Sequence, residues 1–186
     1  MGSDSWNTVN ANFSASTWLQ NSWAKETFPT GKFENSMSFF EASGMEFMIL
    51  TFGYGLSTAE YNWGVAKLAA YPNKRAIIQC HDVNFGNFKA LAEQSTNVFL
   101  IVSGHYDAAE WNNTFVNKAG IVGHEIMSDY QDFKNGYLRY YTFKPAENKV
   151  FAYTYHPLDN VYRTQATSQF SWDYTMTSIK DTVIDT

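Results

Sequence analysis

Three continuous apolar runs mark the middle of the chain, at residues 45–52, 75–80 and 97–103. Most residues in them are apolar, which is typical of strands covered on both faces of a sheet. Segments with helical spacing separate the runs, over residues 57–71 and 88–94. This β-α-β-α-β order predicts an α/β fold in which a parallel sheet is covered by helices.

The first of these helices has clear start and stop signals. Ser57 and Glu60 have the S-x-x-E spacing of a capping box, in which two backbone N–H groups are satisfied reciprocally. Pro72 cannot continue a helix and predicts its end. Between these signals, apolar or small residues recur at helical spacing: Tyr61, Val65, Leu68 and Ala69.

The two ends of the chain have other patterns. Residues 1–35 are rich in Asn, Ser, Thr and Trp with weak periodicity, and we expect an irregular entry segment anchored by aromatic side chains. Residues 36–186 are expected to form one domain, with a strand over 36–44 leading into the parallel unit. After about residue 112, alternating β-branched and aromatic residues with turn signals between them predict an antiparallel β-meander.

The composition limits the function classes. The chain has 186 residues, 45% hydrophobic and 17% charged, with a formal net charge of −5. We expect no nucleic-acid partner, because no Lys/Arg run stands out, and no membrane span, because no apolar stretch approaches the ~18 residues required. Aromatic residues make up 18%, which suggests either a dense core or flat surfaces that contact sugars or proteins.

A single cysteine, Cys80, excludes an intrachain disulfide framework and a Cys-rich zinc site. Its place at the end of an apolar run predicts a buried, inert thiol rather than a nucleophile. Glycosylation sequons at Asn12 and Asn112 favour an extracellular or periplasmic location, although such triplets also arise by chance.

Two polar loops follow consecutive predicted strands. His81 and Asp82 come directly after the strand at 75–80, and His105 and Asp107 follow the next strand. Ligand sites in open α/β sheets form beyond the carboxyl ends of the strands. If the two strands are neighbours, these side chains meet at one edge, where imidazole and carboxylate could bind a divalent ion such as Mn, Fe or Zn.

Simpler interpretations stay open beside this one. A histidine after a strand is usually a hydrogen-bonded loop residue, and His124 and His156 in the predicted meander are expected to be structural. The aromatic residues of 137–143 and 151–156 could line a sugar-binding face, or could divide between the core and a partner-facing surface. No Walker loop, G-x-G-x-x-G, G-x-S-x-G or H-E-x-x-H motif is present, and no organic cofactor is expected.

From about residue 36 to 174 the chain resembles the C-terminal half of calcineurin-like metallophosphoesterases. The matching order is "FFEASGMEFMILTFGYGLS", an amphipathic helix, "YPNKR", a strand with "HD", a strand with "SGH", then "MSDYQDFKNGYLRYYTF" and "TY". The resemblance implies half of a metallophosphoesterase-like β-sandwich. It also implies that His81 and His105 are metal ligands, with Asp107 in place of the last histidine of G-H-x-H. In a metal-dependent hydrolase, Asp82 would orient one of these ligands.

The family's N-terminal D-x-H, G-D and G-N-H-[DE] motifs are absent from this sequence. The resemblance therefore implies that a binuclear centre is not assembled from this chain alone. A half-sandwich exposes an apolar face and a sheet edge, which predicts a homo-oligomer, a filament, or a partner chain supplying the missing half.

Two functions follow. The first is a non-catalytic or degenerate module that self-associates or docks on a partner chain. The second is a metal-dependent phosphoester hydrolase, active alone or when completed by a partner subunit.

Overall fold

The computed structural model describes residues 3–105, 110–131 and 136–176. The chain divides into two compact units, one of residues 1–105 and 112–127 and the other of residues 106–111 and 128–186. The sequence predicts one domain over residues 36–186. In the structure, residues 106–111 and 128–186 form a compact unit of their own. Each unit is described below by itself.

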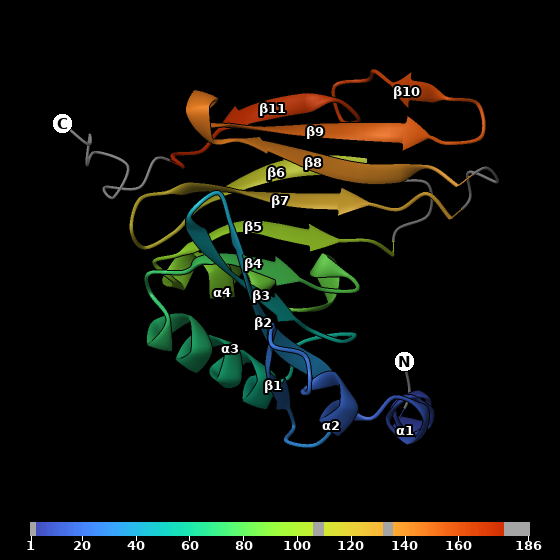
Figure 1. Ribbon diagram of the computed structural model, residues 1–186, viewed down its shortest axis with the longest axis vertical. Helices are drawn as coiled ribbons and strands as arrows, with labels where there is room; N and C mark the ends of the chain where they lie inside the picture. Colours follow the sequence, from blue (N-terminus) through green and yellow to red (C-terminus); the bar gives the residue numbers. More distant parts are fainter. Residues whose placement is uncertain (1–2, 106–109, 132–135, 177–186) are drawn as a thin grey trace. The chain divides into compact units, whose positions relative to one another are not determined.

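The first unit is built on a seven-stranded mixed sheet with the strand order β1-β2-β3-β4-β5-β7-β6 (Figure 1). Its strands are β1 (Ala24–Phe28), β2 (Asn35–Ala42), β3 (Met45–Thr51), β4 (Arg75–Gln79), β5 (Val98–Ser103), β6 (Glu110–Val116) and β7 (Val122–Ser128). The first two residues of β6 and the last residue of β7 belong to the second unit. β3, β4, β5 and β7 are parallel neighbours, whereas β1–β2 and β2–β3 are antiparallel. The predicted α/β class is confirmed.

The three apolar runs form the centre of this sheet. Leu50 of β3, Ile78 of β4 and Ile101 of β5 are neighbours on one face of the sheet, and all three are completely buried. β5 is buried on both faces over Val98–Ile101, whereas β4 alternates, with Ile77 half-buried and Gln79 exposed. The prediction of strands covered on both faces therefore holds for β5 and not for β4.

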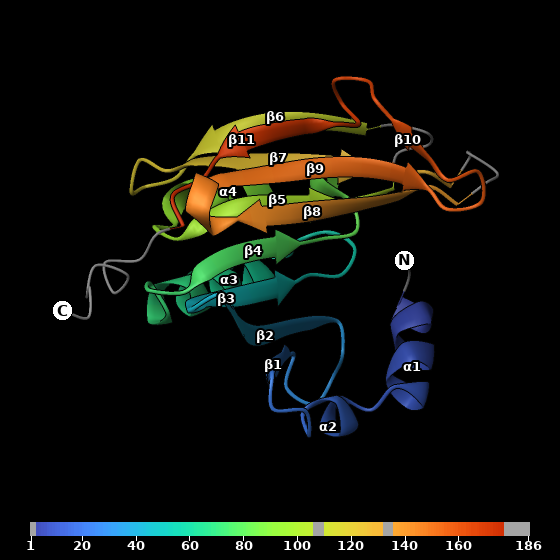
Figure 2. The same cartoon turned by 45° about the horizontal axis from the view of Figure 1, so that its top comes forward.

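Helices α3 (Thr58–Ala70) and α4 (Phe88–Gln94) make the two crossovers and lie on the same face of the sheet (Figures 1 and 2). The capping box of α3 is present as predicted: Ser57 accepts from the Glu60 N–H, and Glu60 accepts from the Ser57 N–H. Gly64 allows the helices to approach, because a Cβ there would lie 3.0 Å from the Leu91 side chain. A 3₁₀ turn, η1 (Val83–Phe85), precedes α4.

The N-terminal segment differs from the irregular entry that its weak periodicity predicts. It contains α1 (Ser3–Asn12), α2 (Ala15–Trp18) and the edge strand β1. Aromatic contacts do fix part of it, since the Trp18 ring lies 5.3 Å from those of both Trp23 and Phe33. Side-chain hydrogen bonds also hold this segment in place. For example, the Asn10 side chain accepts from the Phe33 N–H at 2.6 Å.

The prediction that everything after about residue 112 is an antiparallel meander is wrong for β7. This strand lies parallel to β5 and belongs to the first sheet, between β5 and β6. Five consecutive residues of β7, from Gly123 to Met127, are buried. Burial on both faces suits a central strand, and the polar His124 and Glu125 within it obscured that signal in the sequence.

The second unit contains the predicted antiparallel sheet (Figure 2). β9 (Lys149–His156) pairs antiparallel with β8 (Leu138–Lys144), β10 (Val161–Arg163) and β11 (Phe170–Asp173). A 3₁₀ turn, η2 (Pro145–Glu147), and the left-handed residue Asn148 connect β8 to β9. Within the described ranges, no helix has the length and apolar character needed to cross a bilayer.

Candidate functional site

The ends of β4 and β5 bring His81 and His105 together. Backbone pairing continues past both strands, from the Cys80 N–H to the Val102 carbonyl and from the Gly104 N–H to the His81 carbonyl, each at 3.1 Å. His81 Nε2 then lies 2.8 Å from His105 Nδ1. The expectation that the two histidine loops meet at one edge of the sheet is confirmed.

The backbone of His105 is unusual. Its φ is +70°, in the left-handed region that non-glycine residues enter at a cost of about 1 kcal/mol or more. This conformation follows Gly104 and brings the His105 ring to 4.3 Å from that of His81. Ser43, Asn148 and Asn160 also have positive φ, so this conformation by itself does not mark a functional site.

A cavity of about 340 Å³ adjoins the histidine pair. Its lining comes from α1 and from the ends of β3, β4 and β5: Trp6, Thr51, Phe52, Gly53, Tyr54, Gln79, Cys80, His81, Gly104 and His105. Trp6 packs so closely on the backbone of Gly53 that a Cβ there would lie 2.6 Å from the indole. The Tyr54 ring lies 5.5 Å from that of His81 and 5.8 Å from that of His105. The site is therefore a polar pair of imidazoles beside aromatic walls.

The separation of the two ring nitrogens is that of a hydrogen bond. At a tetrahedral ion, two imidazole nitrogens bound at ~2.1 Å would lie about 3.4 Å apart. The observed 2.8 Å is shorter and matches a hydrogen bond between the two rings. The donors suit Zn, Fe or Mn, but binding such an ion would require His81 and His105 to move apart.

The other predicted site residues do not complete a ligand set. Asp107 lies outside the described residues. Asp82 is buried, and its Oδ1 accepts from the backbone N–H and the side-chain amide of Asn84, so that it caps η1. Among the residues that the structure describes, no three His, Cys, Asp or Glu side chains are grouped to hold a metal.

The remaining candidates are structural. Cys80 is a buried free thiol, as predicted, and burial, assisted by the charges of Asp82 and Glu125, raises its pKa. His124 Nδ1 lies 2.9 Å from Asn112 Oδ1, and burial lowers the pKa of this histidine to about 4. His156 is almost fully buried and contacts Asp159.

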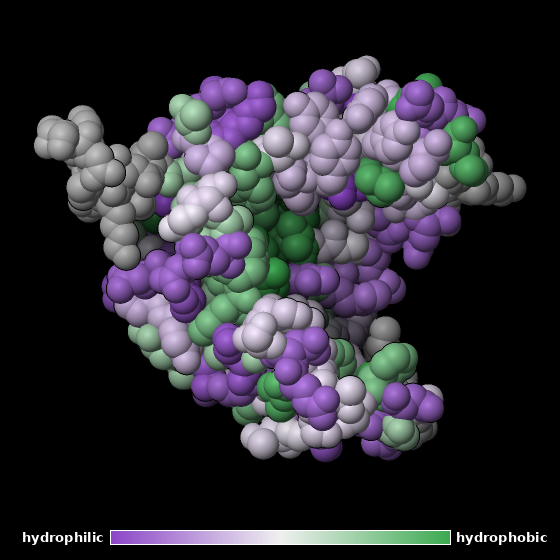
Figure 3. Space-filling view, viewed as in Figure 1, coloured by the Kyte–Doolittle hydropathy of each residue, from purple (hydrophilic) through white to green (hydrophobic). Residues whose placement is uncertain are grey.

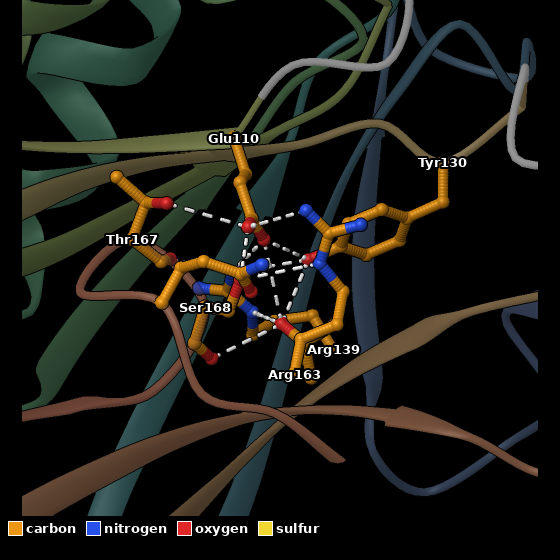
Figure 4. Close-up of polar contacts among 8 residues, drawn as sticks. Glu110, Tyr130, Arg139, Arg163, Thr167 and Ser168 are labelled. Atoms are coloured by element: carbon orange, nitrogen blue, oxygen red, sulfur yellow. Dashed lines mark hydrogen bonds and ion pairs between the residues drawn. The ribbon is translucent and has the colours of Figure 1, made fainter. Parts of the chain in front are cut away.

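The second unit holds a polar cluster that the sequence analysis missed (Figure 4). Glu110 lies at its centre, and its side chain is only 7% exposed. Oε2 accepts from Arg139 Nη2 at 2.7 Å and from the Tyr130 hydroxyl at 2.8 Å. Oε1 accepts from the Ser168 hydroxyl, from Thr167 at 3.3 Å, and pairs with Arg163 Nη2 at 3.4 Å.

The cluster keeps Glu110 ionised. Burial would raise the pKa of this carboxyl, but hydrogen bonds from Ser168 and Tyr130 and the charges of Arg139 and Arg163 outweigh it and lower the pKa. Because both oxygens are occupied by donors, the carboxylate is poorly suited to accept a proton from a substrate. We interpret the cluster as structural. No local motif could reveal it, since Glu110 and Arg139 are far apart in the sequence.

Comparison with known proteins gives one distant relative and no family. No protein-family model matches the chain. The chain is 26% identical over 148 residues to the uncharacterized protein YvnB of Bacillus subtilis (strain 168), an alignment that covers 68% of this chain. The same alignment covers 12% of YvnB, so the chain corresponds to a small part of that protein.

Proposed function

We propose that this chain is a metallophosphoesterase-like module, half of such a β-sandwich, that does not hydrolyse phosphoesters by itself and that self-associates or docks on a partner chain. The observation that carries the proposal is the His81–His105 pair, held at the carboxyl ends of parallel strands without a third ligand in the described residues. The described residues supply at most two of the three ligands of a metal hydrolase, and Asp107, the predicted third, lies outside them.

The docking part of the proposal rests on exposed apolar side chains at the end of the first sheet. β6 is its outermost strand, and Val116 and Val122, near the β6–β7 connection, are 56% and 52% exposed. An edge strand with apolar neighbours is a ready surface for another chain.

The cavity of about 340 Å³ beside the histidines favours a second function, a phosphoester hydrolase completed by a partner subunit. His81 and His105 would supply two ligands, and a bound divalent ion would polarise a phosphoryl oxygen and acidify a water molecule. Within this chain, the hydrogen bond between the rings holds His105 beside His81, and Trp6 and Tyr54 line the adjoining cavity.

Metal analysis, light scattering and a phosphodiesterase assay test these functions on the same preparation. We expect a species larger than the 21.2 kDa chain, with no turnover of bis-p-nitrophenyl phosphate in the presence of Mn²⁺. A clean monomer would contradict self-association. Turnover that His105→Ala abolishes and Leu158→Ala, at an exposed position, retains would contradict the non-catalytic function and support the second one.

A further inference from the structure

The sheet of the second unit carries a row of partly exposed aromatic rings. Along β9, Phe151, Tyr153 and Tyr155 alternate with buried residues, so that all three project from one face. The antiparallel register places Tyr140 of β8 opposite Tyr153, and Tyr162 of β10 opposite Tyr155. These five residues are called the tyrosine face below. Figure 3 shows pale, weakly hydrophilic residues gathered over β8, β9 and β10.

The rings support one another in fixed positions. Tyr140 and Tyr153 are stacked with centroids 5.2 Å apart, and the planes of Phe151 and Tyr153 differ by only 11°. Tyr162 contacts the Tyr155 ring at 4.9 Å, and its hydroxyl lies 3.1 Å from that of Tyr140. A ligand that binds here therefore finds rings that are already ordered, which lowers the entropic cost of binding.

The five side chains of the tyrosine face are aromatic, and the Lys144 Nζ lies 4.8 Å from the centre of the Phe151 ring at its edge. The hydrogen bond with Tyr162 raises the pKa of Tyr140 to about 12, so its hydroxyl stays protonated. The two lysines at one end of the sheet are ion-paired, Lys149 with Asp173 at 2.6 Å and Lys144 with Glu147 at 3.0 Å. A strongly charged polymer thus gains little from this surface.

Polar groups surround the rings. Phe151 lies between Thr142 of β8 and Ser171 of β11 in the register, and Tyr155 donates to Asn160 Oδ1 at 2.8 Å. Hot spots of protein interfaces are usually sealed by neighbouring contacts that exclude water. Here hydroxyl groups and ion pairs adjoin the rings, so a ligand must offer both an apolar surface and hydrogen-bonding groups.

We propose that the tyrosine face binds a neutral polysaccharide. A sugar ring has a face of C–H groups with partial positive charge, which complements the negative face of an aromatic ring. The hydroxyl groups at its rim match the tyrosine, threonine and serine hydroxyls around this surface. Successive sugar units of an extended chain would contact successive rings along the sheet, so that several weak contacts add together.

Affinity electrophoresis in native gels tests this proposal with three probes: hydroxyethyl cellulose, mixed-linkage β-glucan and neutral arabinoxylan. We expect at least one of them to retard the full chain. Tyr140→Ala/Tyr153→Ala should weaken that retardation about tenfold through lost ring contacts, whereas Tyr140→Phe/Tyr153→Phe should retain most of it. Leu158→Ala, at an 81% exposed position of the same unit, is the matched control.

Circular dichroism shows whether the double alanine variant folds, and Tyr162→Ala at a 50% exposed position replaces it if it does not. Unchanged mobility of the wild-type chain with all three polysaccharides would overturn the proposal. Retardation that persists undiminished in the folded alanine variant would also overturn it. So would a sedimenting dimer that this variant converts to a monomer, because the face would then belong to a second copy.

Discussion

Glu110 Oε2 lies 2.7 Å from Arg139 Nη2, and the two side chains are only 7% and 5% exposed. This pair connects the first residue of β6 to β8 within the second unit. Removing one member of a buried ion pair leaves the other charge without compensation in a medium of low polarity. The stability of the second unit is therefore expected to depend on both members.

Glu110→Gln should lower the free energy of unfolding by about 3 kcal/mol, because Arg139 and Arg163 then lose their counter-charge. Chemical denaturation monitored by circular dichroism measures the change. The matched control is Glu147→Gln, which breaks the exposed Lys144–Glu147 pair and should cost less than about 0.5 kcal/mol. Equal losses in the two variants would contradict this account.

The same carboxyl predicts part of the acid sensitivity. Its pKa is lowered in the folded chain, so it contributes stability above its unfolded value of about 4.5, which is lost as the pH falls through the folded pKa. The difference in unfolding free energy between wild type and Glu110→Gln should therefore shrink below about pH 4.5. A difference that stays constant between pH 7 and pH 3 would argue against an ionised Glu110.

His124 predicts a second pH effect, at higher pH. Burial lowers its pKa from 6.5 to about 4, so the unfolded chain binds an additional proton between these values. Its contribution is fully present above about pH 6.5 and lost as the pH falls toward 4, by up to about 3 kcal/mol. His124→Gln should remove this part of the decline. Parallel stability curves for the two proteins would show that His124 does not titrate abnormally.

Replacement of Gly123 by a larger residue should overpack the core of the first unit. A Cβ at this position would lie 2.2 Å from the ring of Phe115, which is buried. Gly123→Ala should therefore destabilise the fold by about 1–3 kcal/mol. Adding Phe115→Leu removes the obstructing ring atoms, so the double variant should be more stable than the sum of the two single changes predicts. Simple additivity would contradict a direct clash.

The capping box of α3 is a fourth target. Ser57→Ala leaves the Glu60 N–H without its acceptor and should cost about 1 kcal/mol in unfolding free energy. Ser57→Thr keeps a hydroxyl acceptor and is the control. Glu60 also accepts from the Asn35 amide at 3.0 Å, so Glu60→Ala should cost more than Ser57→Ala. A thermal melt of the three variants establishes the order.

The predicted site was only partly accessible from sequence. The proximity of His81 and His105 could be predicted from a general rule: neighbouring parallel strands have their carboxyl ends at the same edge of the sheet. The role of Asp82 did not follow, because the backbone after β4 turns into η1 and directs this carboxylate to Asn84. The choice between two uses of one side chain depends on loop geometry, which the residue order does not specify.

The sequence by itself determined the elements whose signals are local: the apolar runs of β3, β4 and β5, the caps of α3, and the alternating pattern of β9. These depend on periodicity and on hydrogen bonds between close neighbours in the chain. Only the tertiary structure decided that β7 lies beside β5 and that Glu110 is held by Arg139. Such pairings depend on which arrangement of segments distant in the sequence has the lowest free energy. A local sequence pattern does not contain that information.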